Sequence, residues 1–189
     1  MEKNRCEWVT KDLLYIQYHD EEWGNIERFC DDHYLFEMLT LEGAQAGLSW
    51  ITILKRRENY REAFDQFDPL KVAAYTEEKI KNLLDNKGII RNKRKIKSTV
   101  NNAKAFINIQ EECGSFHHYL WEFFGGKQIK NHWKRHEEVP AATKESEKLS
   151  KELRKRGFSF VGPVICYSFM QAVGLVNDHT VDCYLYHEK

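Results

Sequence analysis

The segment that most constrains the fold lies near the C-terminus, where Gly162-Pro163 opens a run that is apolar on nearly all sides. Proline is favoured at the first position of a helix, so this pair predicts a helix start. A helix without a polar face is normally buried, and we therefore expect other helices to cover it. Its apolar side chains are Val164, Ile165, Phe169, Met170, Ala172 and Val173.

Further start and stop signals predict helices along most of the chain. The expected helices are 33–41, a segment capped by Ser49 that places Trp50 and Phe64 near one face, 68–75, 76–86, 92–112, 115–124, a segment capped by Ser146 that ends at Gly157, and 163–173. Residues 5–30 show no helical period and are expected to form an irregular lobe, and residues 125–145 a polar loop. No repeat or linker interrupts the chain, which predicts one all-α domain over residues 1–189.

Composition excludes several classes of protein. The 189 residues are 42% hydrophobic and 13% aromatic, which is typical of a globular chain. No apolar run approaches the ~18 residues of a membrane helix, and the first residues lack the apolar centre of a signal peptide. We therefore expect a soluble, cytoplasmic protein with no membrane partner. The five cysteines are odd in number and far apart, which argues against a disulfide framework.

A basic turn in the middle of the chain is a candidate nucleic-acid contact. Net charge is zero, yet six basic residues and no acidic one lie between Lys87 and Lys97. Two short helices joined at Lys87-Gly88-Ile89-Ile90 resemble a helix-hairpin-helix element. Such a turn exposes N–H groups beside a helix start, where an anion is favoured, and basic neighbours attract phosphates. An ordinary connection with a solvated surface fits the residues equally well.

Two cysteines and two histidines near opposite ends of the chain form a candidate metal site. These residue types suit a tetrahedral structural zinc ion. The spacing is not that of a standard zinc finger, and Cys30, His33 and His187 are alternative ligands. Buried thiols and surface imidazoles are the other interpretation. The candidate ligands are Cys6, His19, His179 and Cys183.

A glutamate among small residues is a candidate active-site group. Glu42 follows an apolar helix and precedes Gly43-Ala44, so its carboxyl is expected to be partly buried and perturbed. An aromatic box with one carboxylate would suit a flat cationic ring, although an aromatic core with a capping glutamate is the simpler interpretation. The aromatic residues concerned are Trp8, Tyr15, Tyr18, Trp23 and Trp50.

Several long motifs resemble those of the 3-methyladenine DNA glycosylase I family. The resemblance extends from Arg5-Cys6 to Cys183 and weakens between about Lys127 and Ser146. One departure is Asp12-Leu13, where family members often carry Asp-Pro, and we expect it to affect only a turn. The motifs are Tyr18-His19-Asp20-Glu21-Glu22-Trp23-Gly24, the run Leu41 to Trp50, Gly88-Ile89-Ile90-Arg91, the run from Gly157-Phe158 through Cys166 to Ala172, and Gly174-Leu175-Val176-Asn177-Asp178-His179.

The resemblance implies a helix-hairpin-helix DNA glycosylase fold with an irregular lobe, residues 1–30 and 176–189, joined by one structural zinc ion. Residues 76–112 would form the helix-hairpin-helix element. It also implies roles for the candidate residues. The zinc ligands would be Cys6, His19, His179 and Cys183, the base-binding glutamate Glu42, and the pocket aromatics Trp8, Tyr15, Tyr18, Trp23 and Trp50. Leu48 beside Gly47 would wedge into the duplex, and the hairpin at Gly88 and Arg91 would hold phosphates.

The activity that the resemblance implies is excision of 3-methyladenine from double-stranded alkylated DNA by a monomeric hydrolase of N-glycosyl bonds, without strand cleavage. The damaged base would be flipped into the pocket, stacked on Trp50 and hydrogen-bonded by Tyr18. We expect Glu42 to bind the exocyclic amino group and to stabilise the cationic sugar. Many members of the wider superfamily use an aspartate after the hairpin, but none occurs between Asp85 and Asp178.

Two other functions are considered from the residues. A non-catalytic, zinc-stabilised DNA-binding module would share the hairpin and the metal but would not need Glu42 or the aromatic residues. A zinc hydrolase of small molecules would need an open metal position, and therefore three protein ligands instead of four. The sequence suggests no protein partner.

Overall fold

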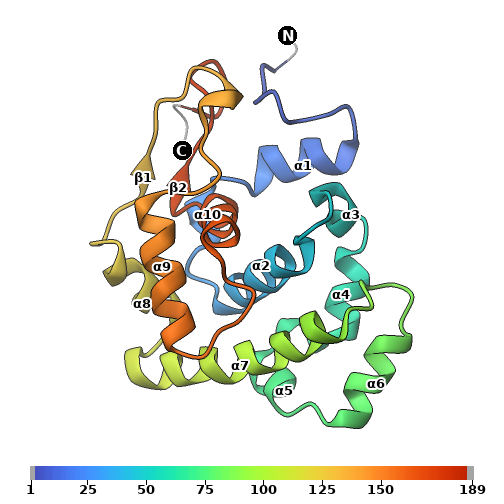
Figure 1. Ribbon diagram of the computed structural model, residues 1–189. Coiled ribbons are helices and arrows are strands. Elements are labelled where there is room, and N and C mark those ends of the chain that lie inside the picture. The colour runs from blue at the N-terminus through green and yellow to red at the C-terminus, as the bar shows by residue number, and fades with distance from the viewer. Residues whose placement is uncertain (1–2, 187–189) are drawn as a thin grey trace.

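The computed structural model describes residues 3–186, which are mostly helical with almost no sheet (Figure 1). This confirms the expected all-α class. The helices are α1 (Leu13–Glu21), α2 (Asp32–Gln45), α3 (Trp50–Leu54), α4 (Arg57–Ala63), α5 (Pro69–Ala73), α6 (Glu77–Asp85), α7 (Lys93–Cys113), α8 (Phe116–Phe123), α9 (Lys144–Lys155) and α10 (Pro163–Ala172). Short 3-10 turns cover Ile26–Arg28, Asp65–Phe67 and His136–Glu138.

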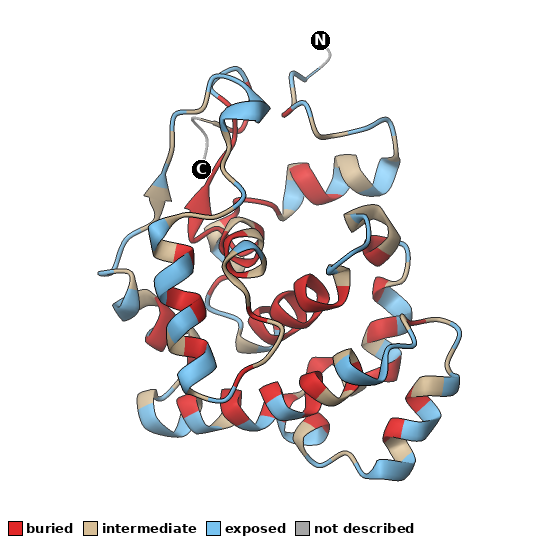
Figure 2. Cartoon of the chain, in the orientation of Figure 1, coloured by how far each residue is buried: buried red, intermediate tan, exposed pale blue. Residues whose placement is uncertain are grey.

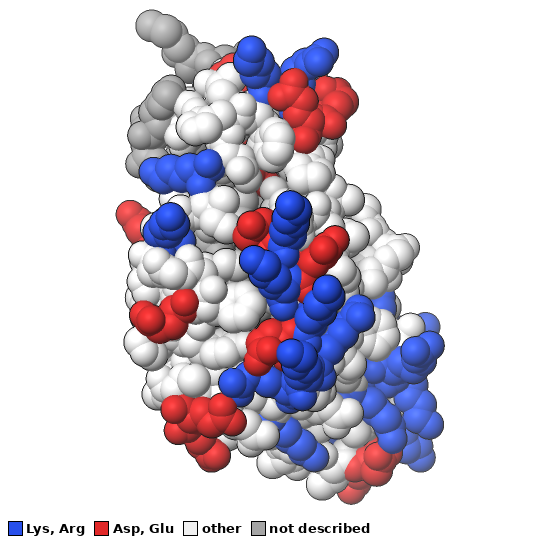
Figure 3. Space-filling view, turned by 60° about the vertical axis from the view of Figure 1, so that its left-hand side comes forward, with Lys and Arg blue, Asp and Glu red and all other residues white. Residues whose placement is uncertain are grey.

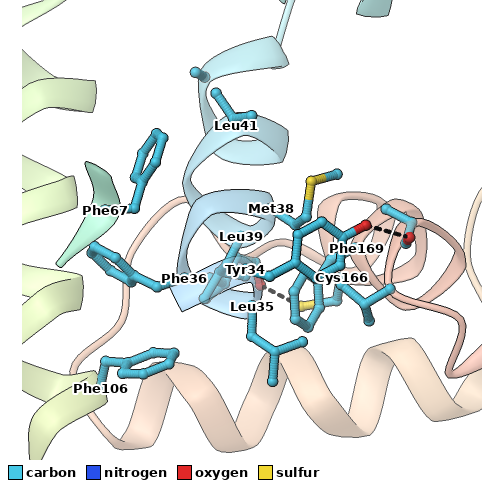
Figure 4. Packing of buried hydrophobic residues seen from close by; sticks show 14 of the residues in the cluster. Tyr34, Leu35, Phe36, Met38, Leu39, Leu41, Phe67, Phe106, Cys166 and Phe169 are labelled. Atoms are coloured by element: carbon cyan, nitrogen blue, oxygen red, sulfur yellow. Dashed lines mark hydrogen bonds between the residues drawn. The ribbon is translucent and has the colours of Figure 1, made fainter. Parts of the chain in front are cut away.

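Helix α2 is the central element of the fold. Asp31 caps its start by accepting hydrogen bonds from the N–H groups of His33 and Tyr34. Every residue from Tyr34 to Ala44 is buried, and the surrounding helices turn their exposed faces outward (Figure 2). Figure 4 shows aromatic and aliphatic side chains of α2 packed against Phe106 of α7 and Phe169 of α10. Because α2 is enclosed along this stretch, Glu42 in its last turn is also buried, although the helix ends at the surface with the exposed Ala46.

Helix α10 is less enclosed than its composition predicts. It packs against α2 and α9, and Phe169 and Met170 are fully buried. Val164, however, is 54% exposed. Ser168 and Gln171 interrupt its apolar surface three residues apart, which places them on one face. That face borders the cavity described below.

The N-terminal lobe is more regular than expected. Residues 13–21 form α1, with the Asp12 side chain capping the N–H of Leu14 at 3.0 Å. The lobe's helical character was missed because α1 presents no continuous apolar face. The Asp12-Leu13 departure therefore falls at a helix start instead of a turn. Leu13 occupies the first helical position, where proline is favoured, and it is 79% exposed.

Two other element boundaries differ from expectation. The segment after Ser49 is not one helix, because non-helical backbone at Arg56 separates α3 from α4. Helix α9 begins at Lys144, and its N-cap is Thr143 and not Ser146. Thr143 and Ser146 form a capping box in which each side chain bonds the other residue's N–H.

The loop between α8 and α9 is tied to the chain beyond α10. Strands β1 (Ile129–Lys130) and β2 (Val176–Asn177) pair in parallel, with Ile129 opposite Val176. This pairing places residues 131–140 beside the chain that follows β2, as seen at the upper left of Figure 1. Within the described part of the chain, no helix has the combination of length and hydropathy needed to cross a bilayer.

Candidate active site and metal centre

A cavity of about 180 Å³ lies where α1, α2, α3, α10 and the loop 131–140 meet. For comparison, a dry engineered cavity of ~150 Å³ holds one benzene molecule. The space therefore suits a planar ring system. Its walls are formed by Trp8, Tyr15, Tyr18, Trp23, Glu42, Gln45, Trp50, His136, Val139, Ser168 and Gln171. The structure thus brings together all six residues that the sequence proposes for a base pocket.

Glu42 is the buried acid of this cavity. Its side chain projects from the last turn of α2 and the residue is 4% exposed. Among residues 3–186, no donor forms a hydrogen bond with its carboxyl. Burial without a compensating partner disfavours the charged form and raises the pKa of Glu42 to about 8. A cation entering beside it would favour the ionised form.

The aromatic walls hold one another mainly by edge-to-face contacts. The Trp8 ring lies 5.7 Å from Tyr15 and 5.1 Å from Trp23, and Tyr18 lies 5.4 Å from Trp50, between centroids. Such arrangements are favoured by the ring quadrupoles. The Tyr15 hydroxyl accepts a hydrogen bond from the Ile51 N–H at 3.2 Å, which ties α1 to the start of α3.

Tyr18 lines the cavity, and its hydroxyl has no hydrogen-bond partner among the described residues. Burial is the main cause that raises the Tyr18 pKa well above its usual value, and the neighbouring Glu42 raises it further. The phenol therefore keeps its proton at physiological pH. No described residue is hydrogen-bonded to this hydroxyl, so it remains free to bond a ligand in the cavity.

Five cavity residues were not identified from the sequence. Ser168 and Gln171 lie inside a motif that carries the family resemblance, and their polar character on an apolar helix was the available signal. Gln45 lies one turn beyond Glu42 on α2. His136 and Val139 come from the irregular loop, where the resemblance is weakest, and nothing in the local pattern indicates that they line the cavity.

The turn between α2 and α3 projects beside the cavity. Gly47 has φ +82°, which favours glycine, and Leu48 is 40% exposed. The Lys95 ammonium of α7 donates to the carbonyls of Ala44 at 2.8 Å and Ala46 at 2.7 Å. A cation at the C-terminus of α2 also complements the helix dipole. Lys95 therefore belongs to this turn and not to an open basic surface.

The predicted hairpin is present between α6 and α7, but only part of it is open. The Gly88 N–H donates to the Asn86 side chain at 2.8 Å, and the Ile90 N–H donates to the Tyr60 hydroxyl at 3.2 Å. Among the described residues, no acceptor bonds the N–H groups of Ile89 and Arg91.

Four of the six cations in the basic run remain exposed. Lys97 pairs with Glu77 at 2.8 Å, and Lys95 is used as described above. The exposed cations are Lys87, Arg91, Lys93 and Arg94. Figure 3 shows that basic side chains gather in places on the surface, although the net charge is zero.

The four candidate metal ligands are buried and lie together. Their ligand atoms all fall within 4.8 Å of one another. The Cys183 sulfur lies 3.4 Å from His19 Nε2 and 3.5 Å from His179 Nδ1, and the Cys6 sulfur lies 3.5 Å from His179 Nδ1. Tetrahedral zinc with usual bond lengths requires sulfur–nitrogen separations of about 3.5 Å. The cluster can therefore hold a metal ion.

The outer ring nitrogens of both histidines are also engaged. His19 Nδ1 lies 2.8 Å from the Asp20 carboxylate, and His179 Nε2 lies 3.1 Å from the Trp23 carbonyl. Such contacts fix the tautomer that directs the other nitrogen to a metal. Cys30 and His33 are exposed and do not belong to the cluster, while His187 lies outside the described residues.

The metal cluster lies directly behind the cavity wall. The His19 ring is 5.5 Å from Trp8, and the His179 ring is 4.8 Å from Trp23, between centroids. Because Trp8 and Trp23 line the cavity, the cluster and the pocket share a wall.

Comparison with known proteins gives matches over nearly the whole chain. A family model described as Methyladenine glycosylase matches residues 8–187. The chain is 52% identical over 182 residues to DNA-3-methyladenine glycosylase 1 of Escherichia coli (strain K12), covering 96% of both proteins. A crystal structure of 3-methyladenine DNA glycosylase I has 51% identity and a TM-score of 0.91, covering 96% of this chain and 98% of that one. A structure from Staphylococcus aureus, described as showing the basis of 3-methyladenine recognition, has 38% identity, a TM-score of 0.91 and 96% coverage of both chains.

Proposed function

Because the chain belongs to the methyladenine glycosylase family, we propose that the cavity around Glu42 binds the methylated base that the enzyme removes from DNA. The protein is a DNA glycosylase of base excision repair that releases 3-methyladenine. The observation that supports the residue assignment is one buried carboxyl, without a described hydrogen-bond partner, in an aromatic cavity of ring size.

Glu42 selects a cationic base. In the empty cavity its pKa of about 8 leaves the carboxyl largely protonated at pH 7. 3-Methyladenine is cationic while it is attached to the sugar, and its charge lowers the pKa of Glu42 when it enters. The resulting ion pair is protected from water. Normal adenine is neutral, so it leaves the Glu42 carboxyl protonated and forms no such ion pair.

The chemical step needs little acid catalysis. The bond between the sugar and the base breaks, and its electron pair leaves with the base, which departs neutral. Water adds to the cationic sugar to form its C1′–OH and loses a proton to the surrounding solvent. The Glu42 carboxylate stabilises the positive charge that develops on the sugar. Trp50 stacks on the base, and the unused Tyr18 hydroxyl supplies a hydrogen bond.

The DNA contacts surround the cavity. The everted base leaves a gap in the stack, and the exposed Leu48, carried by the Gly47 turn, fills it. The hairpin beside Gly88 holds phosphates of a double-stranded, alkylated substrate. It does so through the N–H groups of Ile89 and Arg91 and through its exposed cations. The described chain acts as a monomer and as one domain.

The metal is a structural zinc ion held by Cys6, His19, His179 and Cys183. Four protein ligands leave no open position, so zinc takes no part in hydrolysis. This ligand number also argues against a zinc hydrolase of small molecules. When bound, the ion holds the two terminal segments together behind Trp8 and Trp23.

The test is release of free base from methylated DNA. We expect Glu42→Ala to lower the single-turnover rate about 100-fold, and Glu42→Gln to lower it less because the amide still accepts a hydrogen bond. The exposed Glu62→Gln change on α4 is the control and should leave the rate unchanged. Near-normal rates in both Glu42 variants would remove Glu42 from the mechanism. DNA binding without base release by the wild type would support a non-catalytic module.

A further inference from the structure

A second buried carboxylate lies near the cavity and is already fully used by the protein. Asp178 is 1% exposed. Its Oδ1 accepts hydrogen bonds from Asn131 Nδ2 at 2.7 Å and Trp133 Nε1 at 2.8 Å. Its Oδ2 accepts from Gln171 Nε2 at 2.7 Å and from the Tyr167 hydroxyl. With four donors around it, this carboxylate is a positioning group and not a reacting one.

One of these donors, Gln171, belongs to the cavity wall. It projects from α10 into the cavity that Glu42 borders from α2, and the two helices pack together. Its amide nitrogen is fixed by Asp178. Turning the amide over would bring its oxygen against the Asp178 carboxylate, so that two acceptors would face each other at hydrogen-bond distance. The amide therefore has one preferred orientation.

The amide oxygen is the part of Gln171 that remains available. No described residue donates a hydrogen bond to Oε1, and the side chain is only partly buried because it borders the cavity. Acceptors without described partners thus line the cavity from both helices, and they include the Gln171 oxygen on α10 and the Glu42 carboxyl on α2. The exocyclic amino group of adenine carries two hydrogens, which matches two acceptors.

Resting on the proposed function, we propose that Gln171 is a specificity-determining residue, oriented by Asp178 so that its Oε1 accepts the second amino hydrogen of the everted adenine. Glu42 accepts the first. A methylated guanine carries an oxygen at this position, and that oxygen would face the two acceptors Glu42 and Gln171 instead of donating to them. The pair therefore favours 3-methyladenine over 3-methylguanine, a distinction that cationic charge alone cannot make.

The experiment compares both bases released from one substrate, duplex DNA methylated with radiolabelled methylnitrosourea. We expect Gln171→Leu to lower the ratio of 3-methyladenine to 3-methylguanine release rates about tenfold. This ratio does not depend on the fraction of active protein, so partial misfolding does not obscure it. Gln171→Glu should keep the wild-type preference, because one carboxyl oxygen bonds Asp178 by sharing a proton and the other remains an acceptor.

A matched control exists on α7. Gln110 Nε2 donates to the Asp32 carboxylate at 2.7 Å, the same kind of bond at the same distance, but Gln110 does not line the cavity. Gln110→Leu should leave the ratio unchanged. An unchanged ratio in Gln171→Leu, or equal loss in Gln171→Glu, would overturn the role of Gln171. Failure of the wild type to release 3-methyladenine would instead overturn the proposed function.

Discussion

Glu42 couples the stability of the free protein to pH. The carboxyl keeps its proton up to pH about 8 in the folded state, whereas its ordinary pKa is 4.5. Between these values the folded state binds more protons than the unfolded state. Stability contributed by the neutral carboxyl is therefore present at low pH and lost as pH rises through this window. Above pH 8 the buried carboxylate is ionised and lowers the free energy of unfolding, and a cation bound beside it would offset this loss.

Replacing Glu42 with the neutral Gln should remove this pH dependence. We expect the free energy of unfolding of Glu42→Gln, relative to wild type, to increase by roughly 4 kcal/mol from pH 5 to pH 9. Urea denaturation at both pH values measures it. Glu62→Gln, at an exposed position, should show no such change. A constant difference between Glu42→Gln and wild type would mean that Glu42 titrates normally.

At the scale of elements, Lys95 connects the hairpin between α6 and α7 to the Gly47-Leu48 turn between α2 and α3. It lies in the first turn of α7 and bonds the carbonyls of Ala44 and Ala46, just before Gly47-Leu48. Lys95 therefore links the hairpin that we propose to bind phosphates with the Gly47-Leu48 turn that we propose to enter the duplex. Desolvation lowers the pKa of Lys95, and its bonds to two carbonyls satisfy the ammonium.

Lys95→Met keeps the aliphatic stem and removes these bonds. We expect the rate of base release from duplex DNA to fall about five- to tenfold, with a smaller loss on single-stranded DNA, where no stack must be opened. Lys97→Met is the matched control, since Lys97 forms an ion pair with the exposed Glu77 and no described contact with the Gly47-Leu48 turn. Equal losses on both substrates would show that Lys95 does not act through the wedge turn.

Local patterns predicted the elements whose ends are set by nearby residues. Asp68, Thr76, Asn92 and Ser115 each cap the expected helix start. The failures have a different cause. Helix α1 carries buried residues only at Tyr18 and His19, so its period is weak, and its order depends on contacts with α3 and the metal cluster.

In the candidate site too, some residues could be identified from sequence motifs, whereas others are placed by contacts between distant parts of the chain. The motif residues Glu42 and Trp50 were identifiable by resemblance, and their meeting with Trp8 was implied by it. His136 and Val139 reach the cavity through the β1–β2 pairing and the bonds of Asn131 and Trp133 to Asp178. These contacts span more than 40 residues of sequence. No local period carries such information.

For the whole molecule, the metal cluster joins two segments that lie near opposite ends of the described chain. Cys6 and His19 precede helices α2 to α10, and His179 and Cys183 follow them. A metal that binds all four therefore closes the chain on itself and contributes its binding energy to folding. Since His19 and His179 contact Trp8 and Trp23, loss of the metal should loosen the cavity wall as well as the termini.

We expect about one zinc per chain in the purified protein and substantially less in Cys183→Ser. This variant should melt at least ~10 °C lower, because a structural zinc site is worth several kcal/mol. It should also bind free 3-methyladenine more weakly, as followed by tryptophan fluorescence. Cys30→Ser is the control, since Cys30 is exposed and outside the cluster. Zinc below half an equivalent in the wild type, unchanged by Cys183→Ser, would leave the four residues as a hydrogen-bonded core cluster, and the shared wall would then owe its order to packing alone.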